Sequence, residues 1–196
     1  LLVQTPEKMR SRFNIDVRVD SEVTKIDRHA KTVEVYTHGE TYSEHYDKLI
    51  LAPGASPMKL PIQGLDAENV FTLWSIPDAD KVYRYLTTRD IKSAVVVGGG
   101  FVGIEVTLVE MLDKVMNNVD RDMAQWLHME LNEKGVHLSF SEALVRVEHN
   151  GGKANIVLAS GKSISADMVI LSAGIKPNTE LAKAAGLSLG RKGHII

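Results

Sequence analysis

Apolar and polar positions along the chain follow two periods, one typical of strands and one typical of helices. Residues 32–37 alternate strictly, as a half-buried strand does. In a predicted helix at 120–134, Met123, Leu127 and Leu131 lie four apart, and we expect this face, with Trp126 beside it, to pack in the core. The other predicted strands are 16–19, 21–26, 48–52, 94–97, 136–140, 144–147, 154–158 and 168–171, and the other predicted helices are 1–12, 75–88 and 179–185.

A glycine-rich turn directly follows the predicted strand at 94–97. Gly98, Gly100 and Gly103 form G-x-G-x-x-G, in which the first glycine permits a tight turn, the second a close approach of pyrophosphate, and the third close helix packing. A second apolar run ends in an acid, Glu110. This order indicates a dinucleotide site at a helix N-terminus. The alternatives are a glycine turn without a ligand and, for Glu110, an exposed acid at a strand end.

The connection after this turn is too short. Only eight residues separate Val97 from Val106, whereas neighbouring parallel strands need a crossover of about a dozen residues or more. Glu110 comes seven residues after Gly103, although an acid about 20 residues from the motif is expected. We therefore expect that a helix between Glu105 and Val106 has been lost or left out, the alternative being local rebuilding. A normal peptide bond at this point would contradict the omission.

Two parts of the chain resemble each other. Shifting the sequence by 120 positions places residues 21–57 on 141–177 without a gap, with nine identities. The strand at 48–52 then coincides with the strand at 168–171. We interpret this as two copies of one domain type, each with a β-meander followed by a buried strand, rather than as chance similarity. The first copy is expected to lack its N-terminal nucleotide-binding half.

Composition narrows the function classes. A net charge of −2 gives no reason to expect nucleic acid or an anionic membrane as a partner. The absence of cysteine excludes disulfides, cysteine-ligated metals and thiol catalysis within this chain. The seven histidines show no metal-ligand spacing. The chain begins at Leu1, so we expect either a processed start or an excised fragment, and a cytoplasmic protein fits the composition.

Five motifs, spread over nearly the whole chain, resemble the FAD- and NAD(P)H-dependent pyridine nucleotide-disulfide oxidoreductases. The most similar members are the coenzyme A-disulfide reductase, persulfide reductase and NADH oxidase group. The motifs are LVQTPE at 2–7, DKLILAPGA at 47–55, VGGGFVGIE at 97–105, VDRDMA at 119–124 and SAGIKPN at 172–178. The implied fold is α/β: a Rossmann-like NAD(P)H-binding domain with an inserted β-meander at 76–196, a connector at 58–75, and a partial FAD-binding domain of the same kind at 1–57.

The resemblance also implies roles for individual residues. The pyrophosphate of NAD(P)H is expected on the turn formed by Gly98, Gly99, Gly100, Phe101, Val102 and Gly103. Glu105 is expected near the nicotinamide, in a pocket lined by Ala173, Gly174 and Ile175. Glu110 is expected to bind the adenosine ribose hydroxyls, which favours NADH because a carboxylate repels the 2′-phosphate of NADPH. Contacts to FAD are expected from Val23, Ala52, Pro53 and Gly54.

The family chemistry implied is hydride transfer from NADH to the flavin, followed by reduction of a small-molecule disulfide or persulfide through a cysteine. That cysteine, the first glycine motif and the C-terminal dimerisation domain of the family are missing here, so no catalytic residue is assigned in this chain. We expect a fragment, inactive alone, of an enzyme that is a homodimer when complete. Two alternatives are a stand-alone nucleotide-binding or redox-sensing module without flavin chemistry, and a structural domain with a vestigial glycine turn.

Overall fold

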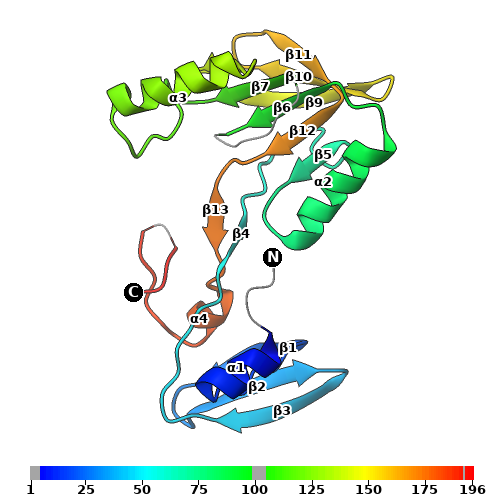
Figure 1. Ribbon diagram of the computed structural model, residues 1–196. Coiled ribbons are helices and arrows are strands. Elements are labelled where there is room, and N and C mark those ends of the chain that lie inside the picture. The colour runs from blue at the N-terminus through cyan, green and yellow to red at the C-terminus, as the bar shows by residue number, and fades with distance from the viewer. Residues whose placement is uncertain (1–4, 99–104, 192) are drawn as a thin grey trace. The chain divides into compact units, whose positions relative to one another are not determined.

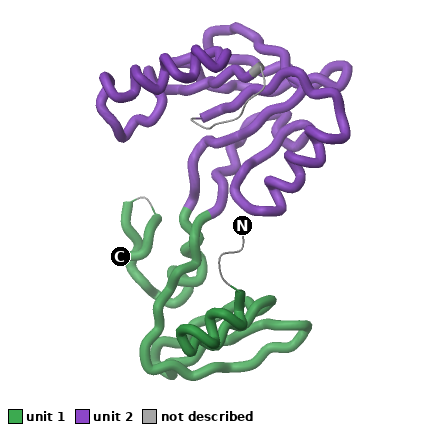
Figure 2. Tube along the Cα trace, viewed as in Figure 1, with its two compact units in different colours: residues 1–55, 177–196 green, residues 56–176 purple. Residues whose placement is uncertain are grey.

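The structure, a computed structural model, describes residues 5–98, 105–191 and 193–196. Two compact units divide the chain, and Figure 2 shows them in different colours. Unit 1 contains Leu1–Ala55 and Pro177–Ile196, and unit 2 contains Ser56–Lys176. Residues 177–196 thus belong to the first unit rather than to the second. The identity of the units as FAD and NAD(P)H domains remains a prediction.

A parallel five-stranded sheet forms the centre of unit 2 (Figure 1). Its order is β5-β12-β6-β7-β8. The strands are β5 (Val70–Thr72), β12 (Met168–Leu171), β6 (Ser93–Val97), β7 (Glu105–Glu110) and β8 (His137–Phe140). The two central strands, β6 and β12, are buried on both faces, which explains why they read as continuous apolar runs in the sequence.

Different layers cover the two faces of this sheet. Alternate strand residues such as Val96 and Leu108 pack against α2 (Ile76–Thr88) and α3 (Arg121–Glu133). The residues between them, such as Val95 and Val109, pack against the meander β9 (Leu144–Asn150), β10 (Lys153–Leu158) and β11 (Ser163–Ala166). Unit 2 is therefore a three-layer α/β structure whose parallel strands all end at the same edge.

The two long helices begin where the sequence predicts. Ser75 caps α2 through a capping box with Asp78, and the hydrogen bond from the Ser75 side chain is the main cause that lowers the pKa of Asp78. In α3 the predicted core face is partly wrong. Leu131 is buried, but Met123 and Trp126 are 65% and 75% exposed, because the buried stripe runs through Ala124 and Leu131 instead.

Strand β7 runs through the point where a missing helix was expected. Glu105 and Val106 are consecutive residues of β7 and pair with Ser93 and Ala94 of β6. The expected break at this bond is therefore wrong for the chain as it stands. The omission of a helix at this bond is thus contradicted, and local rebuilding of the connection is the alternative that remains.

Unit 1 is built on an antiparallel meander. Its strands are β1 (Ser21–Asp27), β2 (Thr32–Thr37) and β3 (Glu40–His45), in the order β1-β2-β3. Helix α1 (Pro6–Phe13) begins at Thr5, whose side chain accepts a hydrogen bond from Lys8 N. The strand predicted at 16–19 is absent. Each of the two sequence copies thus contains a three-stranded meander.

The strand predicted at 48–52 does not form in unit 1. Ile50 is 91% exposed, whereas its counterpart in the second copy, Ile170 of β12, is 3% exposed. Strand β12 is buried because β5 and β6 pair with its two edges. Among the described residues, nothing in unit 1 provides such partner strands, so the prediction of a buried strand at 48–52 is wrong here.

Between the units the chain runs as two short strands. These are β4 (Ala55–Pro57) and β13 (Ile175–Pro177), which pair with each other, and β13 is followed by α4 (Glu180–Ala184). No helix in the described part of the chain is long and apolar enough to cross a membrane.

Candidate functional site

A cavity of about 470 Å³ lies at the carboxyl ends of β6, β7 and β12, within unit 2. This edge is where open α/β sheets bind their ligands, and the volume falls in the usual range for ligand pockets, about 300–1,000 Å³. The cavity is lined by Met58, Leu60, Ile62, Val97, Gly98, Val109, Glu110, Met111, Glu142, Ala143, Leu144, Ser172, Ala173 and Gly174. Four of these, Gly98, Glu110, Ala173 and Gly174, are residues predicted from the sequence.

Gly98 leaves β6 in a conformation that favours glycine. Its φ angle is +94°, and a Cβ atom added there would lie 2.3 Å from the backbone oxygen of Ser172. Its N–H donates to the Val109 carbonyl at 2.9 Å. The first glycine of the motif therefore has a structural reason to be glycine, and its hydrogen bond ties the glycine turn to the end of β7.

Glu110 is the last residue of β7 and lines the same cavity as Gly98. One carboxylate oxygen, Oε1, accepts a hydrogen bond from Leu112 N at 3.0 Å. A carboxylate has about four acceptor positions, so Glu110 retains capacity for the hydroxyls of a ribose. The residue lines the cavity and is only partly buried.

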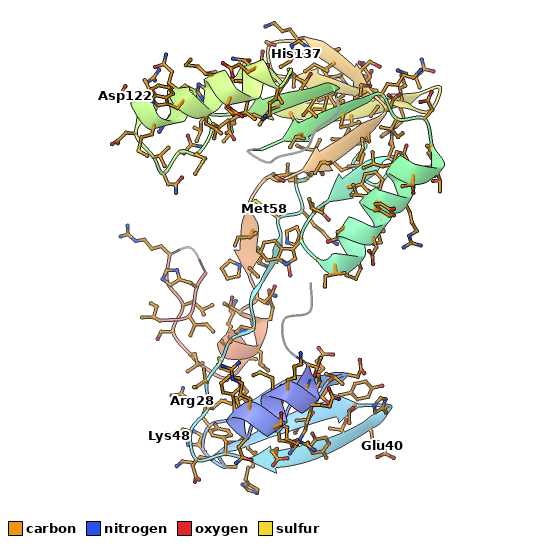
Figure 3. The ribbon with its side chains drawn as sticks, in the orientation of Figure 1. Arg28, Glu40, Lys48, Met58, Asp122 and His137 are labelled. Atoms are coloured by element: carbon orange, nitrogen blue, oxygen red, sulfur yellow. The ribbon has the colours of Figure 1, made fainter. Side chains whose placement is uncertain are left out.

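Ala173 and Gly174 form the third side of the cavity, after β12. Ser172 N donates to the Val97 carbonyl at 2.7 Å, and the Gly174 carbonyl accepts from Met58 N at 3.0 Å. Met58, labelled in Figure 3, thereby brings the connector against this edge of the sheet. Ile175 lies elsewhere, in a neighbouring cavity of about 230 Å³ that it shares with Gly174.

The structure does not bring every predicted residue to the cavity. Glu105 begins β7, opposite Ser93 at the start of β6, so its backbone lies at the amino end of strands whose carboxyl ends form the cavity. Because the connection between β6 and β7 is so short, Glu105 belongs to strand β7 and not to a helix after the glycine motif, where its predicted position near the nicotinamide would require it. The predicted residues Gly99, Gly100, Phe101, Val102 and Gly103 lie outside the described residues.

Sequence reasoning missed Glu142 and the apolar wall. Glu142 is the second residue after β8, is 7% exposed and lines the cavity. An acid just after a predicted parallel strand is a usable signal, because all carboxyl ends of such a sheet share one edge. Met58, Leu60 and Ile62 were interpreted only as connector, and their part in the wall depends on a tertiary contact that no local pattern reveals.

The four residues predicted to touch FAD lie in unit 1 and are solvent-exposed. Val23 on β1 is 38% exposed, and Ala52, Pro53 and Gly54 are exposed as well. The carbonyls of Pro53 and Gly54 already accept hydrogen bonds from Asn178, at 3.0 and 3.1 Å. Residues 1–57 contain two glycines, Gly39 and Gly54, and no G-x-G-x-x-G motif. Within the described ranges no group of histidine and acidic side chains is arranged to hold a metal ion.

Known proteins similar to this chain are oxidoreductases. The reduced CoADR-RHD of Bacillus anthracis matches with 43% identity and a TM-score of 0.87 over 98% of this chain and 37% of that one. An NAD-dependent persulfide reductase from A. fulgidus matches with 37% identity and a TM-score of 0.87 over 97% of this chain and 37% of that one. A coenzyme A disulfide reductase of Staphylococcus aureus is 33% identical over 207 residues, covering 99% of this chain and 46% of that protein.

The chain thus spans less than half the length of these relatives. The family model described as pyridine nucleotide-disulphide oxidoreductase matches residues 4–196, nearly the whole sequence. With the parallel sheet, the meander on one of its faces and the glycine turn after β6, this match shows that the chain belongs to the pyridine nucleotide-disulphide oxidoreductase family.

Proposed function

We propose that this chain is the NADH-binding portion of an FAD-dependent oxidoreductase that reduces a disulfide or persulfide. The observation that carries the proposal is the cavity at the ends of β6, β7 and β12, which gathers Gly98, Glu110, Ala173 and Gly174. These residues come from motifs far apart in the sequence. Their convergence on one cavity is what a dinucleotide site requires.

The residues of this chain hold the dinucleotide rather than react with it. Gly98 forms the tight turn that opens the predicted pyrophosphate-binding motif, and Glu110 accepts hydrogen bonds from the adenosine ribose hydroxyls. Two carboxylates, Glu110 and Glu142, line the same cavity, so the 2′-phosphate of NADPH would meet like charge. We therefore propose that the cavity binds NADH in preference to NADPH. When bound, NADH would supply a hydride.

The proposed substrate class rests on the names of the relatives. The absence of cysteine bears on where the reacting thiol belongs. Two relatives are named as reductases of a disulfide and of a persulfide. Reduction of either substrate needs a thiol, and this chain has none. The thiol and most of the flavin site are therefore proposed to belong to other parts of the complete protein, which we propose to be a cytoplasmic homodimer.

A spectroscopic experiment on the natural full-length protein tests this proposal. We expect it to purify with bound FAD, and we expect anaerobic NADH to bleach the flavin absorbance. Addition of coenzyme A disulfide or a persulfide should then restore the flavin absorbance and release thiol. A full-length protein that binds NADH but carries no flavin would support a nucleotide-sensing module and contradict the proposed enzyme.

A further inference from the structure

Glu142 is a buried acid at the edge of the cavity, and the function proposed above gives it no contact with a particular group of the dinucleotide. It follows β8, and its backbone N–H donates to the Glu110 carbonyl at 3.1 Å. The residue is 7% exposed and lines the cavity. Two acidic residues at neighbouring strand ends, Glu110 and Glu142, thus line the same cavity.

The protein contacts of the Glu142 carboxylate are long. Ser160 N donates to Oε2 at 3.4 Å, near the limit for a hydrogen bond. The ammonium of Lys162 lies 3.9 Å from Oε1, and the Lys162 side chain is 75% exposed. An ion pair this long, with one partner exposed to solvent, contributes little. Most acceptor capacity of Glu142 is therefore available to a ligand in the cavity.

The surroundings of Glu142 suit a flat aromatic base. Leu144 stands two residues further along the chain, and the side chains of Met58, Leu60 and Ile62 provide the apolar wall of the same cavity. An apolar wall covers the faces of a base, while a polar group at its edge provides selectivity. A buried carboxylate in such a place is costly unless a donor meets it.

The adenosine half of NADH carries two kinds of donor, the ribose hydroxyls and the exocyclic amine of adenine. Glu110, at the end of β7, is assigned to the ribose. We propose that Glu142 accepts a hydrogen bond from the exocyclic amine, and so selects adenine over bases that carry an oxygen at this position. This assignment rests on the proposed NADH site.

Reduced nicotinamide hypoxanthine dinucleotide is the probe that isolates this contact. It differs from NADH by a carbonyl oxygen in place of the exocyclic amine and by a hydrogen on the adjacent ring nitrogen N1, so a carboxylate placed to meet the amine would face an acceptor at the C6 substituent. A hydrogen bond to a charged group contributes about 1.5–3 kcal/mol, which corresponds to about 10- to 150-fold in affinity. We expect the wild-type chain to bind NADH more tightly than the hypoxanthine analogue by a factor in this range.

The experiment titrates the 196-residue chain with both dinucleotides and follows nicotinamide fluorescence. Glu142→Gln preserves the side-chain size and adds a donor, so the ratio of the two dissociation constants should fall to about one or reverse. The control is Glu148→Gln, at an ion-paired glutamate of β9 whose side chain is 50% exposed, and it should keep the wild-type ratio.

Each outcome decides a definite point. If Glu142→Gln weakens both dinucleotides equally and the ratio stays at the wild-type value, Glu142 has only a structural role and the inference is overturned. A wild-type chain that binds the two dinucleotides with equal affinity also overturns the inference. A folded wild-type chain that binds neither dinucleotide overturns the proposed NADH site, and this inference with it.

Discussion

At the scale of single residues, Glu110 is both predicted from the sequence motif and found in the lining of the cavity. Its side chain donates nothing and accepts only the Leu112 N–H among the contacts described, so removing it should leave the fold intact. Glu110→Ala should weaken NADH binding by about 10- to 150-fold, because it removes charge-assisted hydrogen bonds worth about 1.5–3 kcal/mol. Fluorescence titration measures this, with Glu130→Ala on α3 as a control that should bind normally. An unchanged NADH dissociation constant in Glu110→Ala would reject the ribose role.

A side chain at Gly98 should destabilise the fold by a steric clash as well as by backbone strain. Gly135 serves as the matched position, where only the strain applies. Gly98 and Gly135 both have positive φ angles, +94° and +77°, but only at Gly98 would a Cβ meet another backbone segment. Gly135→Ala should cost about 1–2 kcal/mol of unfolding free energy from strain alone. Gly98→Ala should cost clearly more, since β6 and the residue after β12 must move apart. Equal losses in chemical denaturation would show that the contact with Ser172 is unimportant.

Asp167 links the amino ends of the two central strands and predicts a pH dependence. Burial raises its pKa, but hydrogen bonds from Lys92 N, Ser93 Oγ and Ser93 N outweigh that effect and lower the pKa from 3.8 to about 2. A pKa depressed in the folded state stabilises the protein above the unfolded value, so this contribution is complete above 3.8 and is lost as pH falls towards 2.

Asp167→Asn should therefore lower the unfolding free energy by about 2 kcal/mol at neutral pH. The difference from wild type should shrink as pH falls from 3.8 to about 2. Chemical denaturation at several pH values tests this. The control is Asp47→Asn at the exposed counterpart in the first copy, which should change stability by less than about 0.5 kcal/mol. A loss at Asp167→Asn that does not vary with pH would contradict the electrostatic account.

At the scale of elements, the connection between β6 and β7 is shorter than a crossover between neighbouring parallel strands normally is. The match to the Staphylococcus aureus reductase extends over 207 positions, 11 more than the 196 residues of this chain. That relative therefore has residues within the matched span that have no counterpart here. A crossover between neighbouring parallel strands needs about a dozen residues or more, so the shortfall is of the right size for one helix.

The sequence predicts helices and strands well where the local pattern agrees with the tertiary contacts. It fails where burial depends on whether neighbouring strands or helices are present. Ile50 and Ile170 occupy equivalent positions of the repeat, yet only Ile170 has neighbouring strands and is buried. Trp126 fits a helical stripe but points outward, because the stripe of α3 that packs inward passes through Ala124 instead. Periodicity alone does not distinguish such cases.

At the scale of the whole molecule, the sequence predicts the fold class and part of the cavity. The glycine motif and the acid at a strand end identify Gly98 and Glu110 because their spacing has a direct physical meaning. The sequence does not predict that Glu142 and Met58 line the cavity, because their positions depend on contacts between segments far apart in the chain. The two copies of the repeat differ in what surrounds the meander. Unit 2 has a parallel sheet with a cavity at its edge, whereas the first copy has only its meander.

The most direct test of the account is a crystal structure of this chain with NADH bound. We expect the dinucleotide in the cavity at the ends of β6, β7 and β12, with its pyrophosphate at Gly98. The adenosine ribose hydroxyls should lie within about 2.5–3.0 Å of the Glu110 carboxylate oxygens. NADH bound elsewhere, or a cavity that stays empty of NADH at a saturating concentration, would contradict the central claim.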